Sequence, residues 1–204
     1  MTTRWINTSD KKALVNMERF LPNQGNYQSL IVFQKAECIY DITYYFAHKF
    51  LAKGDRTIDQ MIQAARSGKQ NIAEGSAASA TSSETELKLT NVAKASLHEL
   101  LVDYEDFLRV RKLQQWATDD PRSVQTRRVC AKHNDSAFYR DAIETRSAET
   151  IANIAITLIH QEDYMLRKLI DRLQDDFVKN GGIKERMYQA RINYRNRSGG
   201  KKEE

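Results

Sequence analysis

Proline and glycine are scarce in this chain, with two prolines and eight glycines among 204 residues. A β-sandwich or β-barrel needs a turn after every short strand, and these two residues supply most turn signals. Residues that favour helices, such as alanine, leucine, glutamate and lysine, are by contrast frequent. The composition therefore predicts an all-α protein, and a hydrophobic content of 41% is enough to build a core.

Cysteines and uninterrupted apolar segments are also few. Cys38 and Cys130 form neither a metal-type pair nor a disulfide framework, so we expect two reduced thiols in a cytoplasmic protein. The N-terminus, MTTRWINTSDKK, lacks the apolar segment of a signal peptide. The longest apolar segment, residues 30–51, is interrupted by Lys35, Glu37, Asp41 and His48. We therefore expect no membrane span.

Metal-binding patterns are missing as well. None of the four histidines follows a glutamate by three residues, which is the spacing found in di-iron helical bundles. The pair His98-Glu99 lacks the second histidine of the zinc-protease motif. We expect neither a metal nor a cofactor.

The net charge of +5 is unevenly distributed. Residues 109–132 carry a formal charge of +5 and residues 184–204 carry +4, which leaves about −4 for the rest of the chain. Two basic segments on a mildly acidic body favour an anionic partner, and nucleic acid is the first candidate. The alternative is that the basic residues only form solvated helix faces and a disordered tail.

Hydrophobic periodicity predicts four long helices, because apolar residues recur at alternating spacings of three and four. The first three helices are expected over about residues 27–51, 55–75 and 83–115, and the fourth from about residue 151 to Gly181-Gly182. Gly75 is expected to end the second helix as a left-handed cap. The sequence Ser83-Glu84-Thr85-Glu86 fits a capping box at the start of the third.

Short connections between helices of roughly 30 to 50 Å predict an up-down-up-down four-helix bundle. The bundle is expected to cover residues 27–182, preceded by an N-terminal arm at 1–26. A helical insert at about 116–146 separates the third and fourth helices, and Asp119-Asp120-Pro121 begins its short helix. Residues 136–145 fit either a separate turn or the beginning of the fourth helix. Residues 183–204 are expected to form a basic suffix and disordered tail.

The stretch RSGKQNIAEGS, residues 66–76, combines small and amide side chains. Gly68 and Gly75 are small enough to let a neighbouring helix approach closely. Asn71 and Glu74 fit a polar site near a helix end, but an amide and an acid beside a glycine cap more often make structural hydrogen bonds. We therefore interpret Asn71, Glu74 and Gly75 as a structural motif.

The segment Asn71-Ile72-Ala73-Glu74-Gly75-Ser76, in this helical context, resembles the four helix bundle proteins encoded in intervening sequences of bacterial large-subunit ribosomal RNA. That family includes the accessory variability proteins of diversity-generating retroelements. Residues 181–188, GGIKERMY, look like the C-terminal module of the branch with a suffix domain. The likeness covers roughly residues 27–115 and 147–192.

This resemblance implies a bundle that assembles as a ring, commonly a pentamer, with a basic surface that holds nucleic acid and with no known catalytic activity. The chain departs from the family at one place. Family members often carry an arginine pair and an apolar residue ahead of the motif, where this chain has Ile62, Gln63 and Gly68. The resemblance therefore does not extend to an anion contact at that place.

Two groups of basic residues are the predicted nucleic-acid contacts, since cations pair with phosphates and the interleaved Tyr188 and Tyr194 suit base stacking. The groups are Arg109, Arg111, Lys112, Arg122, Arg127, Arg128 and Lys132, and Lys184, Arg186, Arg191, Arg195 and Arg197. In the alternative interpretation, Ile183, Met187, Tyr188 and Ile192 dock the tail on the bundle and its arginines only stay solvated.

The sequence thus predicts a non-catalytic, homo-oligomeric bundle, a pentamer by resemblance, that binds RNA or DNA. An oligomeric scaffold for another protein, for example a reverse transcriptase, is the first alternative, with off-stripe apolar residues such as Tyr40 and Leu101 as contacts. A helical ribonuclease is the second. Arg128 and His133 stand five residues apart, as in nucleotide-associated helical ribonucleases, and would hold and protonate a phosphate ester.

Overall fold

The computed structural model describes residues 26–199, and the side chains of Ala142 and of residues 197–199 are not part of that description. The N-terminal arm expected at 1–26 therefore lies outside the described residues except for Asn26, as do residues 200–204. Every regular element within 26–199 is helical, which confirms the all-α class. In chain order the elements are η1 (Tyr27–Ser29), α2 (Ile31–Phe50), α3 (Thr57–Ala78), α4 (Ser83–Val110), α5 (Pro121–Lys132), α6 (Ser136–Ile143), α7 (Ala148–Asn180) and α8 (Ile183–Gly199).

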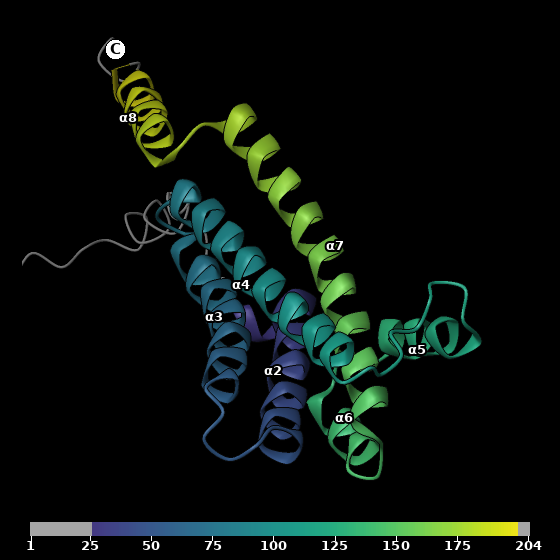
Figure 1. Ribbon diagram of the computed structural model, residues 1–204. Helices are drawn as coiled ribbons and strands as arrows, with labels where there is room; N and C mark the ends of the chain where they lie inside the picture. Colours follow the sequence, from purple (N-terminus) through teal and green to yellow (C-terminus); the bar gives the residue numbers. More distant parts are fainter. Residues whose placement is uncertain (1–25, 200–204) are drawn as a thin grey trace, which may run out of the picture.

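Four of these helices form a bundle around one hydrophobic core. Helix α2 packs against α3 and α7, and α4 packs against the same two helices from the other side. Short loops join α2 to α3 at one end and α3 to α4 at the other (Figure 1). At the centre, Phe46 packs against Tyr104 and Phe107, and the Tyr104 hydroxyl donates to Thr43 Oγ1 at 3.0 Å. The fold is thus a helical bundle, as predicted.

Two buried glycines bring α3 close to α4. A Cβ at Gly68 would lie 2.7 Å from Leu97 Cδ2, and one at Gly75 would lie 3.4 Å from the carbonyl oxygen of Glu86. The predicted close approach is therefore confirmed. The predicted helix cap at Gly75 is wrong, because α3 continues through Ala77 and Ala78, both good helix formers, with no left-handed residue at its end.

Most other helix ends follow from local chemistry. Asp120 caps α5 by accepting from the Arg122 amide, and Gly181 ends α7 with a φ of 66°. Two predicted ends shift. Ser82, not Ser83, caps α4 by accepting from the Thr85 amide at 3.1 Å. Helix α4 ends at Val110 instead of near residue 115, since Lys112 adopts a φ of 55° in a left-handed cap.

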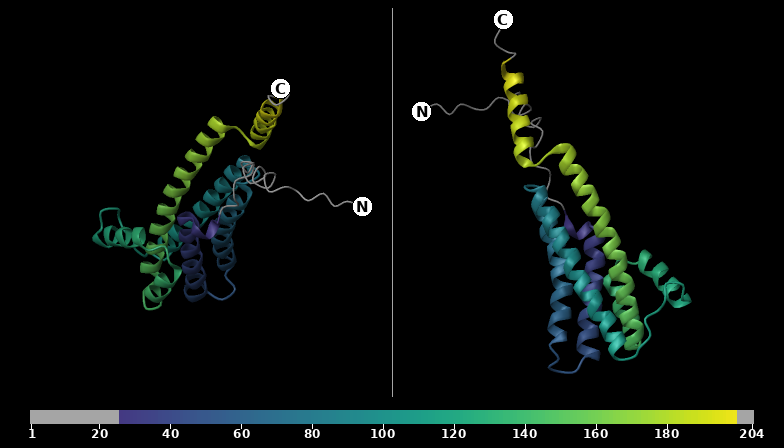
Figure 2. Two further views of the ribbon diagram at one scale, coloured as in Figure 1. Left: turned by 180° about the vertical axis from the view of Figure 1, so that it is seen from behind. Right: turned by 45° about the horizontal axis from the view of Figure 1, so that its top comes forward.

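The insert lies outside the four-helix bundle and packs against two of its helices. Helix α5 lies on the N-terminal half of α7, and α6 lies on α2. Beyond the bundle, the C-terminal half of α7 and all of α8 form an arm that projects away from α5 and α6 (Figures 1 and 2). The two basic segments of the chain therefore lie in separate places. Among the described helices, none combines the length and apolarity needed to cross a membrane.

Candidate nucleic-acid interface

Helix α8 presents one face that combines cations with an aromatic ring. Lys184, Tyr188, Arg191 and Arg195 follow one another at spacings of four, three and four, which places them on one stripe of the helix. All four are exposed, and Tyr188 is 63% exposed. Arg191 and Arg195 have no hydrogen-bond or ion-pair partner among the described residues. This stripe, which we call the α8 basic stripe, is free to contact an anion.

The start of α8 lies close to the beginning of α4. The Arg186 guanidinium donates to Ser83 Oγ at 3.3 Å, so this residue links the two helices. A hydrogen bond from Lys88 lowers the pKa of the Glu84 carboxyl, and the charge of Lys184 lowers it further. The side chain of Arg197 falls outside the description. Of the basic residues predicted in the C-terminal segment, Arg186 therefore has a structural contact, whereas Arg191 and Arg195 remain unpaired in the part of the chain described.

A separate apolar stripe lies beside the α8 basic stripe. Ile183, Met187, Ala190 and Tyr194 repeat the same spacing one residue earlier. Met187 is 48% exposed and Tyr194 is 66% exposed, so the bundle does not cover these two side chains. Of the four residues in the alternative that docks the tail on the bundle, Met187 and Tyr188 are exposed, whereas Ile183 and Ile192 are half-buried. Most of α8 stands off the bundle as part of the arm (Figure 2).

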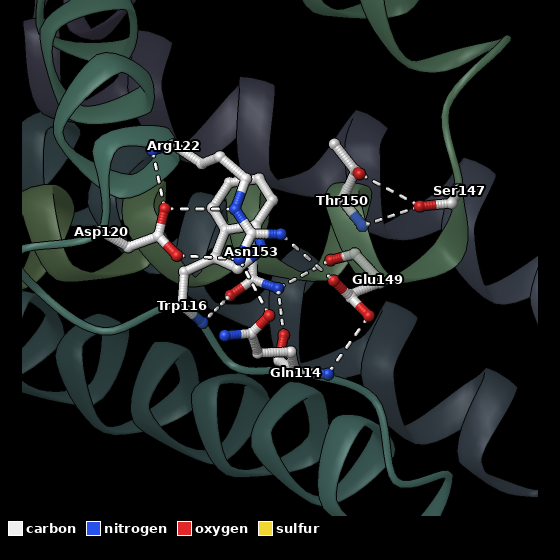
Figure 3. Close-up of polar contacts among 8 residues, drawn as sticks. All are labelled: Gln114, Trp116, Asp120, Arg122, Ser147, Glu149, Thr150 and Asn153. Carbon is white, nitrogen blue, oxygen red and sulfur yellow. Dashed lines mark hydrogen bonds and ion pairs between the residues drawn. The ribbon is translucent and has the colours of Figure 1, made fainter.

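In the insert, Arg122 belongs to a polar network that fixes residues 114–122 onto the start of α7 (Figure 3). Its guanidinium donates to Asp120 at 2.8 Å and to Gln114 Oε1 at 2.9 Å, and it lies 3.7 Å from Glu149. The guanidinium carbon also lies 4.9 Å from the centre of the Trp116 ring. Arg122 therefore has local partners for its charge and its planar face.

Asn153 is the centre of this network. Its side-chain oxygen accepts from the Trp116 amide at 2.8 Å, and its Nδ2 donates to the carbonyl oxygens of Gln114 and Glu149 at 2.9 and 2.8 Å (Figure 3). Asn153 is 3% exposed. A buried side-chain amide is normally hydrogen-bonded, and this one bonds to three backbone groups. Asn153 therefore ties the insert to α7. Its place in an otherwise apolar segment of the sequence gives no sign of this role.

The other basic residues near the insert divide by their contacts. Arg127 donates to Ser123 Oγ at 2.9 Å and to the Thr118 carbonyl at 2.7 Å, which closes the loop before α5. Arg109 pairs with Asp106 at 2.6 Å, and the Arg111 guanidinium lies over the Phe107 ring. Three residues are exposed and have no partner within the described range: Lys112, Arg128 and Lys132. Only these three resemble the free cations of the α8 basic stripe.

A buried lysine holds the end of α5. Lys35 on α2 is 2% exposed and donates through its ammonium group to the carbonyl oxygens of Cys130 and His133, the latter at 3.2 Å. These carbonyls lie at the C-terminus of α5, where a positive charge is favourable. Burial lowers the pKa of Lys35. It also raises the pKa of Glu162, which is 0% exposed and whose oxygens lack a hydrogen-bond partner among the described residues.

His133 has structural contacts on both its ring and its backbone. The ring stacks on Phe138 at 3.8 Å between centroids with an interplanar angle of 4°. The backbone carbonyl accepts from Tyr139 at 2.8 Å in addition to Lys35. Arg128 is exposed on α5. Of the two residues in the ribonuclease alternative, Arg128 is thus exposed, whereas the ring of His133 packs against Phe138.

The residues of the predicted structural motif have different surroundings. Asn71 Nδ2 donates to the carbonyl and the hydroxyl of Ser67 at 2.8 and 3.2 Å, one helical turn away. Gly75 is buried against α4, whereas Glu74 is exposed. Asn71 and Gly75 therefore act within the fold, and Glu74 makes no comparable contact in the described structure.

Both cysteines are buried free thiols, and burial raises the pKa of Cys38 to about 12. Within residues 26–199, no cluster of three or more histidine, cysteine, aspartate or glutamate side chains is arranged to hold a metal ion. Comparisons with protein-family models, with curated proteins and with solved structures found no match for this chain.

Proposed function

We propose that this chain is a non-catalytic nucleic-acid-binding protein that contacts the phosphates of RNA or DNA mainly through helix α8. The observation that carries the proposal is the α8 basic stripe, in which three cations and one tyrosine share an exposed helix face. Arg191 and Arg195 lack a partner in the described residues, so binding a phosphate breaks no existing ion pair. Phosphate contacts together with a stacking ring suit a single-stranded nucleic acid.

The insert has a smaller part in this proposal than the sequence indicated. Arg122 and Arg127 already bind groups of the insert itself, and moving them would release the loop that they hold. Lys112, Arg128 and Lys132 are the residues of this region that we propose as additional phosphate contacts. Helix α5, which carries Arg128 and Lys132, lies far from α8 (Figure 1), so one chain presents two separate basic areas.

We further propose that the protein acts in the cytoplasm as a homo-oligomer, a pentamer as its resemblance to the bacterial four helix bundle family implies. Exposed apolar side chains on the arm support association, since Phe177 is 42% and Val178 is 82% exposed. An oligomer would also hold several α8 helices together, and linked weak sites bind one strand more tightly than separate ones. Light scattering at micromolar concentration tests this part, and a monomeric mass contradicts it.

Fluorescence anisotropy with a labelled single-stranded RNA and a DNA of equal sequence tests the binding. The variant Lys184→Gln/Arg191→Gln/Arg195→Gln removes the charges of the α8 basic stripe and keeps helix-forming side chains. We expect its affinity to fall by roughly tenfold or more at moderate salt, since about three phosphate contacts are lost. The matched control is Lys53→Gln/Arg56→Gln/Arg172→Gln, which removes three exposed charges elsewhere. Equal affinity of both variants contradicts the proposal.

The alternative function is that of a protein-interaction scaffold. The exposed apolar residues at the end of α7 favour it, because they would equally suit a protein partner. A pull-down separates the two functions. A partner retained after nuclease treatment and at high salt supports the scaffold, whereas loss of all partners under both conditions supports nucleic-acid binding.

A further inference from the structure

A cleft lies between the insert and the bundle, away from the α8 basic stripe. Its volume is about 620 Å³, within the range that small organic ligands occupy. The walls come from residues 115–118, from α5, from α7 and from Lys35 of α2. The network around Asn153 fixes one wall, and Lys35 fixes the end of α5. The cleft is therefore bounded by elements that are held in place before any ligand arrives.

The charged groups in this cleft are all basic. Lys35 and Arg127 line it, and no aspartate or glutamate is among its lining residues in the described structure. Arg127 is half-buried, yet its partners are a hydroxyl and a carbonyl, so its charge is not neutralised by a carboxylate. Partly buried cations without a counter-charge are uncommon in folded proteins. The cleft consequently favours an anionic ligand.

Two aromatic rings flank the same space. Trp116 lies at one wall and Tyr164, which is 57% exposed, lies at the rim on α7. Rings of this kind favour flat ligands, because stacking adds to the burial of apolar surface. Trp116 Nε1 and Gln161 Oε1 are buried and have no hydrogen-bond partner among the described residues. A buried donor and a buried acceptor left unpaired at one cleft mark a place where a polar partner is missing.

We propose that this cleft binds a small planar aromatic anion, of the class of aromatic carboxylates and nucleoside monophosphates. The anionic group pairs with the guanidinium donors that the bonds of Arg127 to Ser123 and Thr118 leave free, so Arg127 keeps its place in the loop. The ring lies between Trp116 and Tyr164. A polar edge of the ring supplies the partners that Trp116 Nε1 and Gln161 Oε1 lack. The site is independent of the proposed nucleic-acid contacts on α8, since its residues belong to the insert, α2 and α7.

Tryptophan fluorescence tests the proposal directly, because the chain has only two tryptophans. Trp5→Phe leaves Trp116 as the only tryptophan of the full-length protein. The probes are adenosine 5′-monophosphate, 4-hydroxybenzoate and, as a cationic control, benzylamine. We expect saturable changes with one or both anions at millimolar concentration or below, and none with benzylamine. The anion that binds more tightly identifies the class. No saturation with either anion, or equal binding of benzylamine, overturns the proposal.

Variants then connect binding to the cleft. Arg127→Met keeps the length of the side chain and removes its charge, and we expect affinity to fall roughly tenfold to a hundredfold. The matched control, Arg172→Met, removes an exposed charge on α7 and should leave affinity unchanged. If Arg127→Met unfolds, as judged by circular dichroism, Tyr164→Ala replaces it, because that exposed ring carries no structural hydrogen bond in the described residues. Full affinity in a folded Arg127→Met or Tyr164→Ala protein overturns the proposal.

Discussion

At the scale of single residues, the least expected feature is the pair of buried ionisable groups, Lys35 and Glu162. Both lie in the core, on α2 and α7, and each influences the pKa of the other. In the sequence, Lys35 only interrupts an apolar segment, and no pattern distinguishes Glu162 from the other acidic residues. The helical pattern places a residue on a face, but it does not tell whether a charge there is buried against carbonyl groups.

Replacing Lys35 with methionine should destabilise the protein. The variant keeps the apolar stem but removes the donor that serves the carbonyls of Cys130 and His133. Hydrogen bonds from charged groups contribute roughly 1.5–3 kcal/mol each, so we expect a loss of about that size in the free energy of unfolding. Urea denaturation measures it, with the exposed Lys53→Met as control. Unchanged stability would show that Lys35 does not hold the end of α5.

The variant Glu162→Gln should become more favourable relative to the wild type as pH rises. The pKa of Glu162 in the folded protein lies well above its ordinary value of 4.5, because burial disfavours the charged form. The folded state therefore retains the proton that the unfolded chain releases. The wild type consequently loses stability as pH rises above 4.5, the ordinary pKa that applies to the unfolded chain. Glutamine does not titrate. Urea midpoints of both proteins at about pH 4 and pH 7 measure the stability of Glu162→Gln relative to the wild type. If that relative stability stays constant or falls between pH 4 and pH 7, this assignment is contradicted.

For the basic residues, too, the sequence pattern does not tell which side chains have partners in the folded protein. From the sequence, Arg122, Arg127 and Arg128 were equivalent members of one basic segment. The structure separates them, because Arg122 and Arg127 bind groups of the insert while Arg128 is exposed. Partners such as Gln114 and Glu149 become neighbours only when the insert folds back on α7, and no local pattern in the sequence encodes that contact.

At the scale of elements, helix starts and ends were predictable wherever one residue decides them. Asp120 before Pro121 begins α5, and Gly181 ends α7, both as expected. Gly75 was misread because a glycine near a polar linker fits a cap as well as a close helix contact. The deciding factor was α4, whose backbone lies 3.4 Å from the position of a Cβ at Gly75.

The two glycines of α3 should respond differently to alanine. A Cβ at Gly75 meets α4 at ordinary contact distances, so Gly75→Ala should be neutral or should stabilise by up to about 1 kcal/mol through helix propensity. At Gly68 it would lie 2.7 and 2.8 Å from two atoms of Leu97, so Gly68→Ala should destabilise by roughly 1–3 kcal/mol. Thermal melting of both variants compares them. Equal melting temperatures would mean that α3 and α4 are not packed this closely.

Asn153→Ala should release the insert from α7. The Trp116 amide and the Gln114 carbonyl would lose this partner at part-buried positions, which costs roughly 1–3 kcal/mol for each group left unsatisfied. We expect faster hydrogen exchange in residues 114–132, with α3 and its contact with α4 still protected. Thr150→Ala, which changes an exposed contact with Ser147, is the control. Uniform exchange across the chain in Asn153→Ala would contradict a local anchoring role.

At the scale of the whole molecule, the bundle and the arm divide the chain into two parts with different surfaces. The bundle buries its apolar residues between α2, α3, α4 and α7, whereas the arm exposes apolar and basic side chains. The all-α class and the bundle could be predicted because hydrophobic periodicity records which face of a helix is buried. The cleft beside α5 could not, since its walls come from segments distant in sequence that meet only after folding.

If α8 binds nucleic acid through phosphates, as we propose, the affinity must depend on salt concentration. For a single strand, each phosphate contact adds about 0.7 to the slope of log affinity against log salt. Removing the charges of Lys184, Arg191 and Arg195 should therefore lower the slope by roughly 2, while the control variant at Lys53, Arg56 and Arg172 keeps the wild-type slope. A slope that is the same for all three proteins, or an affinity that does not change with salt, would contradict phosphate binding by α8.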